Sequence, residues 1–111
     1  MDTHAYRLQA KTAKALAHPT RIAILEMLRR GERCVCEMES ELGASQANIS
    51  QHLAALRDAN LVVGRREGMR IQYQVNDERV FQVLDLLAAI RHDQLNQARQ
   101  TLAALESVAV V

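Results

Sequence analysis

Apolar residues recur every three or four positions in the first half of the chain, and this spacing predicts α-helices. The first predicted helix covers residues 1–17, and its apolar candidates are Tyr6, Leu8, Ala13 and Leu16. The second begins at Pro19, a residue that suits the first turn of a helix, and stops at Gly31. Its apolar face repeats at Ile22, Leu25 and Leu28.

Two shorter helices follow, joined by the tight connection LGAS. The first of them is predicted from Cys36 to about Leu42, and Gly43 ends it. The second covers residues 45–58, with Ser45 as its N-cap. A single apolar stripe runs along this second helix and predicts the face that it buries: Ile49, Leu53 and Leu56.

The period changes to strict alternation over residues 61–76, which is the period of a β-strand. In LVVGRREGMRIQYQV, apolar and polar residues fall on opposite sides of a segment whose turn contains glycine, and this predicts a β-hairpin. One side carries Met69, Ile71, Tyr73 and Val75. The other side carries Arg70, Gln72 and Gln74.

A long helix is predicted over residues 77–107, capped by Asp77. At 1.5 Å per residue it would span about 45 Å, which is more than one small domain covers. Its spare apolar face is therefore expected to pack on another subunit. The apolar positions are Val80, Val83, Leu84, Leu87, Ile90, Leu95, Ala98, Leu102 and Leu105.

This order of elements predicts a winged helix-turn-helix: a mainly α (α+β) fold in one domain, residues 1–111, with a two-stranded hairpin as the wing. Residues 1–17 and 77–107 would be dimerisation helices, and residues 45–58 the DNA-reading helix. Short polar side chains at the head of that helix are suited to base edges in the major groove: Ser45, Gln46, Asn48, Ser50 and Gln51. On the wing, Arg65, Arg66 and Arg70 are placed to reach phosphates or the adjacent minor groove.

His52 has two interpretations. It follows the polar head of the reading helix and could contact DNA, but it also lies beside Leu53 and near Leu56 and could form a hydrogen bond within the domain. A polar helix face and arginines in a turn are each common on protein surfaces. DNA binding is therefore predicted from the ordered combination of helix, turn, polar-headed helix and basic wing, and not from any one of these features.

Composition narrows the class of protein. The chain has 111 residues, of which 49% are hydrophobic and only 3% aromatic, so its core must be aliphatic, and oligomerisation would help to cover its apolar faces. A net charge of +1 gives no general attraction to nucleic acid. The first residues lack the apolar run of a signal peptide and no run is long enough to span a membrane, so a cytoplasmic protein is expected. No nucleophile triad, phosphate loop or HExxH motif indicates an enzyme.

Cys34 and Cys36 flank a single valine just before the reading helix. In a regular helix two such residues face about 200° apart, whereas in an extended segment they share one side, so joint binding of one ion needs an extended or unwound first turn. Binding would then distort the third helix and shift the reading helix behind it. Arg33 and the helix N-terminus favour the thiolate, the form that binds soft ions.

Two cysteines do not complete a usual zinc site, and they suit trivalent arsenic or antimony better, with a third position left to another thiol, water or a nearby group. Two alternatives remain open for the pair. The cysteines could be small buried hydrophobic residues. They could also sense oxidants or persulfides by becoming linked, although a disulfide across one residue is expected to be strained.

The segments LAHPTRIAILEMLRRGERCVCEM and SQANISQHLAALRDANLV resemble the ArsR/SmtB family of metal-responsive repressors, and the likeness extends from Leu16 to Val75. Its most specific motifs are CVC and SQHLxxL. The resemblance implies a homodimeric winged-helix repressor that binds double-stranded operator DNA through the polar head of its fourth helix. It also implies that the repressor leaves the operator when an inducer binds. The inducer expected here is As(III) or Sb(III) at Cys34 and Cys36, with Cd, Pb or Zn as the alternative.

The chain departs from the family's patterns at three places. Arsenic-responsive members often carry a third cysteine where this chain has Glu39. The cadmium-lead type uses cysteines of the N-terminal arm, and here that arm offers only His4. The zinc site of the last helix needs an Asp-x-His and a His-x-x-Glu. In this chain Asp85 is followed by two leucines, and Leu95 stands three positions after His92. This second site is therefore expected to be absent.

Overall fold

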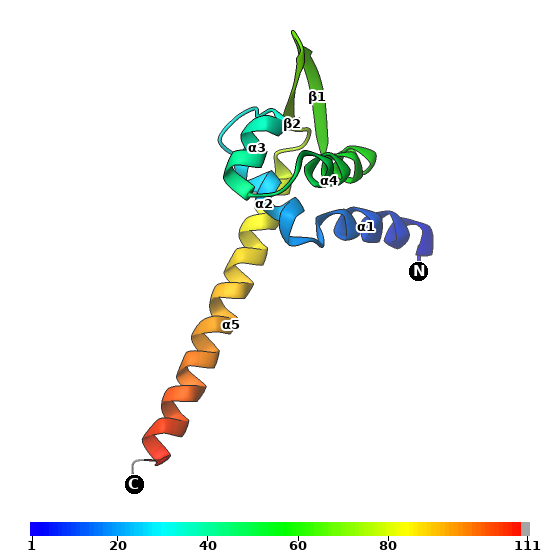
Figure 1. The fold of residues 1–111 in the computed structure, drawn as a ribbon. Coiled ribbons are helices and arrows are strands. Elements are labelled where there is room, and N and C mark those ends of the chain that lie inside the picture. The colour runs from blue at the N-terminus through cyan, green and yellow to red at the C-terminus, as the bar shows by residue number, and fades with distance from the viewer. Residues whose placement is uncertain (110–111) are drawn as a thin grey trace. The chain divides into compact units, whose positions relative to one another are not determined.

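The computed structural model describes residues 1–109, and it divides the chain into two compact units, residues 1–81 and a second unit that begins at Gln82. The first unit is a winged helix-turn-helix with a two-stranded hairpin (Figure 1). The elements in chain order are α1 (Thr3–Leu16), α2 (Pro19–Leu28), α3 (Val35–Leu42), α4 (Gln46–Asp58), β1 (Val62–Glu67), β2 (Arg70–Val75) and α5 (Arg79–Ala109).

Local capping explains where α4 begins and where α3 ends. The Ser45 hydroxyl accepts a hydrogen bond from the Asn48 backbone N–H at 3.2 Å, as predicted for the N-cap of the reading helix. Gly43 ends α3 with a φ of +63°, a left-handed conformation that suits glycine. These two caps enclose the three-residue turn between α3 and α4, which makes the helix-turn-helix tight.

The core lies between α2, α3 and α4 and is aliphatic. The predicted stripe of α4 is confirmed, because Ile49, Leu53 and Leu56 are all buried. They share the interior with the buried apolar residues of α2 and α3: Ile24, Leu25, Met27, Leu28 and Met38. Of the apolar candidates in the predicted dimerisation helix α1, Leu16 is buried within this chain, whereas Tyr6 and Leu8 are exposed. Burial of those two side chains would require a second molecule.

The wing is an antiparallel hairpin in which Val62 pairs with Val75 and Glu67 with Arg70. Gly68 closes its turn with a φ of +63°. Gly64 is required for a different reason: a Cβ atom at this position would lie 2.8 Å from the Ile71 side chain and 3.1 Å from the Tyr73 ring. Tyr73 is the one buried residue of the predicted apolar side, while Met69 and Ile71 stay exposed.

Asp77 caps the start of α5, as predicted. Its carboxylate accepts hydrogen bonds from the backbone and the guanidinium of Arg79, and these hold the pKa of the carboxyl at about 2. The helix begins at Arg79 and continues to Ala109, two residues later at each end than the predicted range of 77–107. In residues 1–109 no helix combines the length and hydropathy needed to cross a membrane.

Candidate nucleic-acid interface and cysteine site

The two cysteines lie at the very start of α3. Cys34 is its N-cap, with an extended backbone (φ −88°, ψ 167°), and the helix starts at Val35, one residue earlier than predicted. The extended N-cap places both sulfurs on one side, so the helix does not need to unwind to bring them together. The structure joins them in a disulfide, with the Cα atoms 5.4 Å apart. The extended backbone of Cys34, which lies outside the helix, is what brings the two sulfurs within bonding distance.

The two cysteines differ in exposure. Cys34 is only 2% exposed, whereas Cys36 lies at the surface. The Cys34 backbone N–H donates to Glu37 Oε1 at 3.2 Å, which fixes the turn that carries the pair. Burial of Cys34 agrees with the interpretation of cysteine as a small apolar residue, but exposure of Cys36 does not. In the described part of the chain, no cluster of three His, Cys, Asp or Glu residues is arranged to hold a metal ion.

The segment before the cysteines is bound to the wing. Arg33 forms a two-way backbone bridge with Tyr73 of β2: the Tyr73 N–H donates to the Arg33 carbonyl at 2.8 Å, and the Arg33 N–H donates to the Tyr73 carbonyl at 3.2 Å. The neighbouring Glu32 accepts from Arg65 of β1 at 2.6 Å. The two residues that precede Cys34 are therefore bonded to both strands of the wing.

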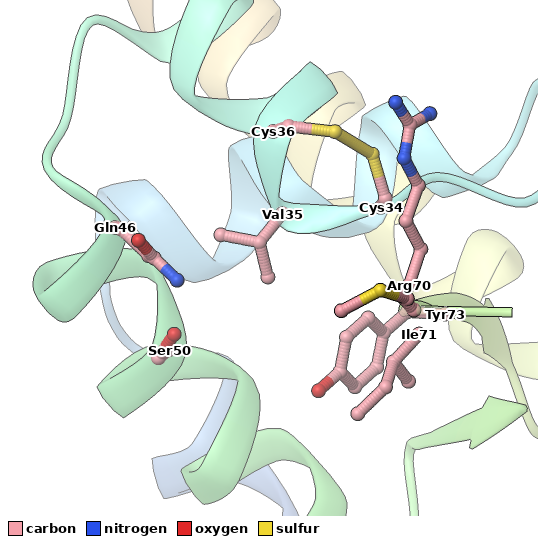
Figure 2. A pocket seen from close by; sticks show the side chains of 9 residues that line it. Cys34, Val35, Cys36, Gln46, Ser50, Arg70, Ile71 and Tyr73 are labelled. Carbon is pink, nitrogen blue, oxygen red and sulfur yellow. A yellow bond between two sulfur atoms is a disulfide. The ribbon is translucent and has the colours of Figure 1, made fainter. Parts of the chain in front are cut away.

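A cavity of about 400 Å³ opens between the cysteines, the reading helix and the wing (Figure 2). Gln46 and Ser50 enter it from α4, and Arg70, Ile71 and Tyr73 enter it from β2 on the other side. The disulfide and Val35 form the boundary on α3. Residues predicted separately to bind an ion and to read DNA thus line one space.

The predicted DNA-reading residues of α4 form an exposed polar surface. Gln46, Asn48, Ser50 and Gln51 are all exposed and make no side-chain hydrogen bond within the described residues. Ser45 is exposed as well, but its hydroxyl oxygen already accepts from Asn48. Gln46 and Ser50, one turn apart, face the cavity. This surface fits the donors and acceptors of base edges.

The three wing arginines are not equivalent. Arg65 pairs with Glu32 and with Glu67, at 2.6 and 3.2 Å, so its guanidinium is occupied inside the protein. Arg66 and Arg70 are exposed and pair with no carboxylate in the part of the chain that the structure describes. Their guanidinium groups are therefore not engaged by carboxylates of the described residues. Sequence reasoning could not separate Arg65 from Arg66, because Glu32 is 33 residues away from Arg65.

His52 contacts the start of α2. Its Nδ1 accepts a hydrogen bond from Arg21 Nε at 3.1 Å, and its ring stacks at a tilt on His18, with the ring centroids 4.2 Å apart. Arg21 also donates to the Ala15 carbonyl near the end of α1. Of the two interpretations of His52, the geometry favours the one in which it bonds within the domain and links the reading helix to α1 and α2. The sequence signal for this cluster was the HPTR motif, which supplies both partners.

We expect this link to weaken in acid. Partial burial lowers the pKa of His52 below its ordinary value of 6.5, and the nearby His18 and Arg21 charges lower it further. A lowered folded-state pKa means that the stabilisation is complete above pH 6.5 and is lost as the pH falls through the folded value. The free energy of unfolding should therefore decrease between pH 7 and pH 5. Chemical denaturation at each pH measures this decrease.

The matched variant is His52→Gln, because a glutamine carbonyl can still accept from Arg21 but does not titrate. Its loss of stability over the same range should be smaller than that of the natural protein. His4→Gln, at an exposed position of α1, serves as the control and should leave the wild-type slope unchanged. Equal slopes for His52→Gln and the natural protein would contradict the assignment.

The family model of bacterial regulatory proteins of the arsR family matches residues 18–63. Two curated relatives are similar over most of the chain. A probable mercury resistance operon repressor of Streptomyces lividans is 38% identical over 84 residues, covering 76% of this chain and 67% of the relative. The regulator NmtR of Mycobacterium tuberculosis is 39% identical over 94 residues, covering 85% and 77%.

Among solved structures, the chain is similar to the homodimeric winged helix-turn-helix DNA-binding domain of Mb0332 from Mycobacterium bovis, described as a possible ArsR-family regulator. The TM-score is 0.75 at 32% identity, and the match covers 84% of this chain and 86% of that one. The likeness in fold thus includes the helix-turn-helix and the wing together.

Proposed function

The chain belongs to the arsR family of bacterial regulatory proteins, and from this premise we propose that it is a homodimeric repressor whose inducer binds Cys34 and Cys36. The family is one of DNA-binding transcriptional regulators and not of enzymes. The observation that carries the proposal is the shared cavity: both sulfurs, the head of the reading helix and the wing line the same space. A ligand held by the sulfurs would act directly on the surface that reads DNA.

The expected inducer is a soft, thiophilic ion, with As(III) or Sb(III) first. The two sulfurs lie close enough to bond to a single atom, and sulfur ligands select soft ions over magnesium or calcium. Only the reduced pair binds such an ion, so a cellular thiol must open the disulfide first. The name of the Streptomyces relative mentions mercury, which is also thiophilic, and this supports the sulfur site without choosing the ion.

Coupling to DNA is proposed to run through the segment Glu32–Cys34. Binding of an ion by both sulfurs would change the geometry of the α3 N-terminus. The segment forms two backbone hydrogen bonds with Tyr73 and an ion pair with Arg65, and these contacts would transmit the change to the wing. Release needs only a difference in ion affinity between the DNA-bound and free shapes of this segment.

A titration of reduced protein bound to operator DNA with single ions tests this proposal. Arsenite and antimonite should release the DNA at micromolar concentration, while magnesium and calcium should have no effect. Release by cadmium, lead, mercury or zinc, but not by arsenite, would keep the cysteine switch and change its inducer. Failure of every soft ion to release the DNA would reject the proposal.

The disulfide favours a second candidate function, a thiol redox or persulfide switch on the same pair. Here oxidation itself, without an ion, would alter the start of α3 and lower DNA affinity. Operator binding compared between phosphine-reduced and diamide-oxidised protein tests it. Equal affinity of the two forms would exclude this function, and weaker binding of the oxidised form that is restored by reduction would support it.

The wing and the reading helix are proposed to have different roles in DNA binding: the wing contacts phosphates, and the reading helix contacts bases. Arg66→Ala should weaken binding to all sequences, and it should reduce the slope of log affinity against log salt by about one, because one phosphate contact is lost. Gln46→Ala should instead relax sequence preference at one base position and leave the salt slope unchanged. Binding to operator and to scrambled DNA at several salt concentrations measures both effects. Equal, sequence-independent losses in the two variants would contradict this division.

A further inference from the structure

We propose that Glu32 is a positioning residue that keeps Arg65 away from DNA phosphates and so limits the sequence-independent part of DNA binding. Released from Glu32, Arg65 would be a third wing arginine on the phosphate backbone, beside Arg66 and Arg70. This inference rests on the proposed function at one point, the phosphate contacts of the wing.

Arg65 is held by two carboxylates at a single nitrogen atom. Its Nη2 donates to Glu32 Oε2 at 2.6 Å and to Glu67 Oε2 at 3.2 Å. One positive and two negative charges leave these three residues with a net charge of −1. A phosphate that approaches Arg65 therefore meets a repulsive field and must displace a carboxylate. Arg66 and Arg70 present no such obstacle, because no carboxylate of the described residues pairs with them.

Glu32 is held in place by its surroundings more firmly than Glu67 is. The next residue, Arg33, exchanges two backbone hydrogen bonds with Tyr73 of β2, at 2.8 and 3.2 Å. The Arg33 guanidinium also donates to the Glu32 carbonyl oxygen at 2.8 Å. The Glu32 side chain is 33% exposed and that of Glu67 is 61% exposed, so water screens the pair with Glu32 less. Glu32 is therefore the residue that decides where the Arg65 side chain lies.

The register of the hairpin shows the direction in which Arg65 is held. Gly64 stands opposite Tyr73, and the Tyr73 ring lies on the side of the cavity and the reading helix (Figure 2). Successive side chains of a strand alternate, so Arg65 leaves the opposite face of the hairpin and Arg66 the face of Tyr73. A wing at the narrow minor groove has a phosphate backbone on each side. An arginine on either face can then reach a phosphate once it is not paired.

Removal of the Glu32 charge should strengthen DNA binding. In Glu32→Gln, affinity for operator and for scrambled DNA should rise by the same factor, about three- to tenfold at low salt. The slope of log affinity against log salt should steepen by about one, because one phosphate contact is gained. Fluorescence anisotropy at several salt concentrations, without any added ion, measures both quantities. Glu32→Ala, which also removes the hydrogen-bond acceptor, should give at least the same gain.

A double-mutant cycle with Arg65→Ala shows whether Glu32 acts through this arginine. In the Arg65→Ala background, Glu32→Gln should leave the salt slope unchanged, because the arginine that it releases is absent. Glu39→Gln is the matched control: Glu39 is also half-buried, and it forms no ion pair in the part of the chain that the structure describes. Its variant removes the same charge and should change affinity by less than about twofold, with the natural salt slope.

Loosening of the segment before the cysteines, a purely structural effect, would weaken binding and would not steepen the salt slope. A Glu32→Gln variant that binds like the natural protein, or whose gain persists in full in the Arg65→Ala background, would overturn the inference and leave the proposed function standing. A gain on operator DNA alone would overturn it as well. An unchanged salt slope in Arg66→Ala would reject the proposed role of the wing itself, and the inference with it.

Discussion

Cys36→Ser is expected to abolish release of the repressor from its operator by arsenite while leaving operator binding itself unchanged. Serine keeps the size of cysteine but removes the soft ligand, and one remaining thiolate cannot hold the ion against water and cellular thiols. Cys36 is exposed and lies outside the predicted DNA contacts, so the substitution should cost little stability. The measurement is operator binding by fluorescence anisotropy with increasing arsenite, using reduced protein.

Cys34→Ser should give the same loss of response but is a less clean variant. Cys34 is 2% exposed, and a buried hydroxyl without a partner costs about 1–3 kcal/mol. Its unfolding must therefore be measured alongside its DNA binding. Glu39→Ala is the control on the same helix, since a carboxylate is a poor partner for a soft ion, and its release curve should match the natural one. Normal release in both serine variants would refute the cysteine switch.

The local features of this fold could be predicted from the sequence, because they depend on neighbours within one or two turns. The apolar stripe of α4, the Ser45 cap, the Gly43 stop and the alternation in the wing all follow from spacing and backbone preference. The same reasoning identified the head of α4 as a polar surface. It also located the cysteine pair in front of that helix.

The contacts between distant segments could not be predicted, because nothing in local spacing specifies them. Arg65 was predicted to contact DNA, and its ion pair with Glu32, which is 33 residues away, could not be foreseen from spacing. The bridge between Arg33 and Tyr73 likewise joins segments that no periodic pattern relates. The start of α3 was predicted one residue too late: the helix begins at Val35, and Cys34 is its extended N-cap. These long-range contacts join the segment before the cysteines to the wing.

Leu87→Asp is expected to have the largest effect on DNA affinity, although it lies far along the chain from the reading helix. Leu87 is 44% exposed and lies at the centre of an apolar stripe on α5. The other large exposed members of the stripe are Val83, Ile90, Leu95, Leu102 and Leu105. So much apolar surface on one helix is typical of a face that packs against a partner subunit, and the related Mb0332 domain is described as homodimeric.

A buried carboxylate in that face should dissociate the dimer, because burying an unpaired charge costs several kcal/mol. The monomer then reads one half-site instead of two and loses the gain from binding the second site intramolecularly. A loss of operator affinity of about 100-fold or more follows from effective concentrations in the millimolar range. Sedimentation velocity at micromolar protein measures the assembly, and operator binding measures the affinity.

Asn96→Asp is the matched control for Leu87→Asp. It adds the same charge to the same helix, but nine residues at 100° each place it on the opposite side of α5. This variant should remain a dimer and bind the operator like the natural protein, because the exposed polar side of the helix gains only a solvated carboxylate. The comparison separates the effect of the apolar face from a general effect of negative charge near DNA. A natural protein that sediments as a monomer at micromolar concentration, or a Leu87→Asp variant that stays dimeric with full affinity, would show that α5 does not hold two reading heads together.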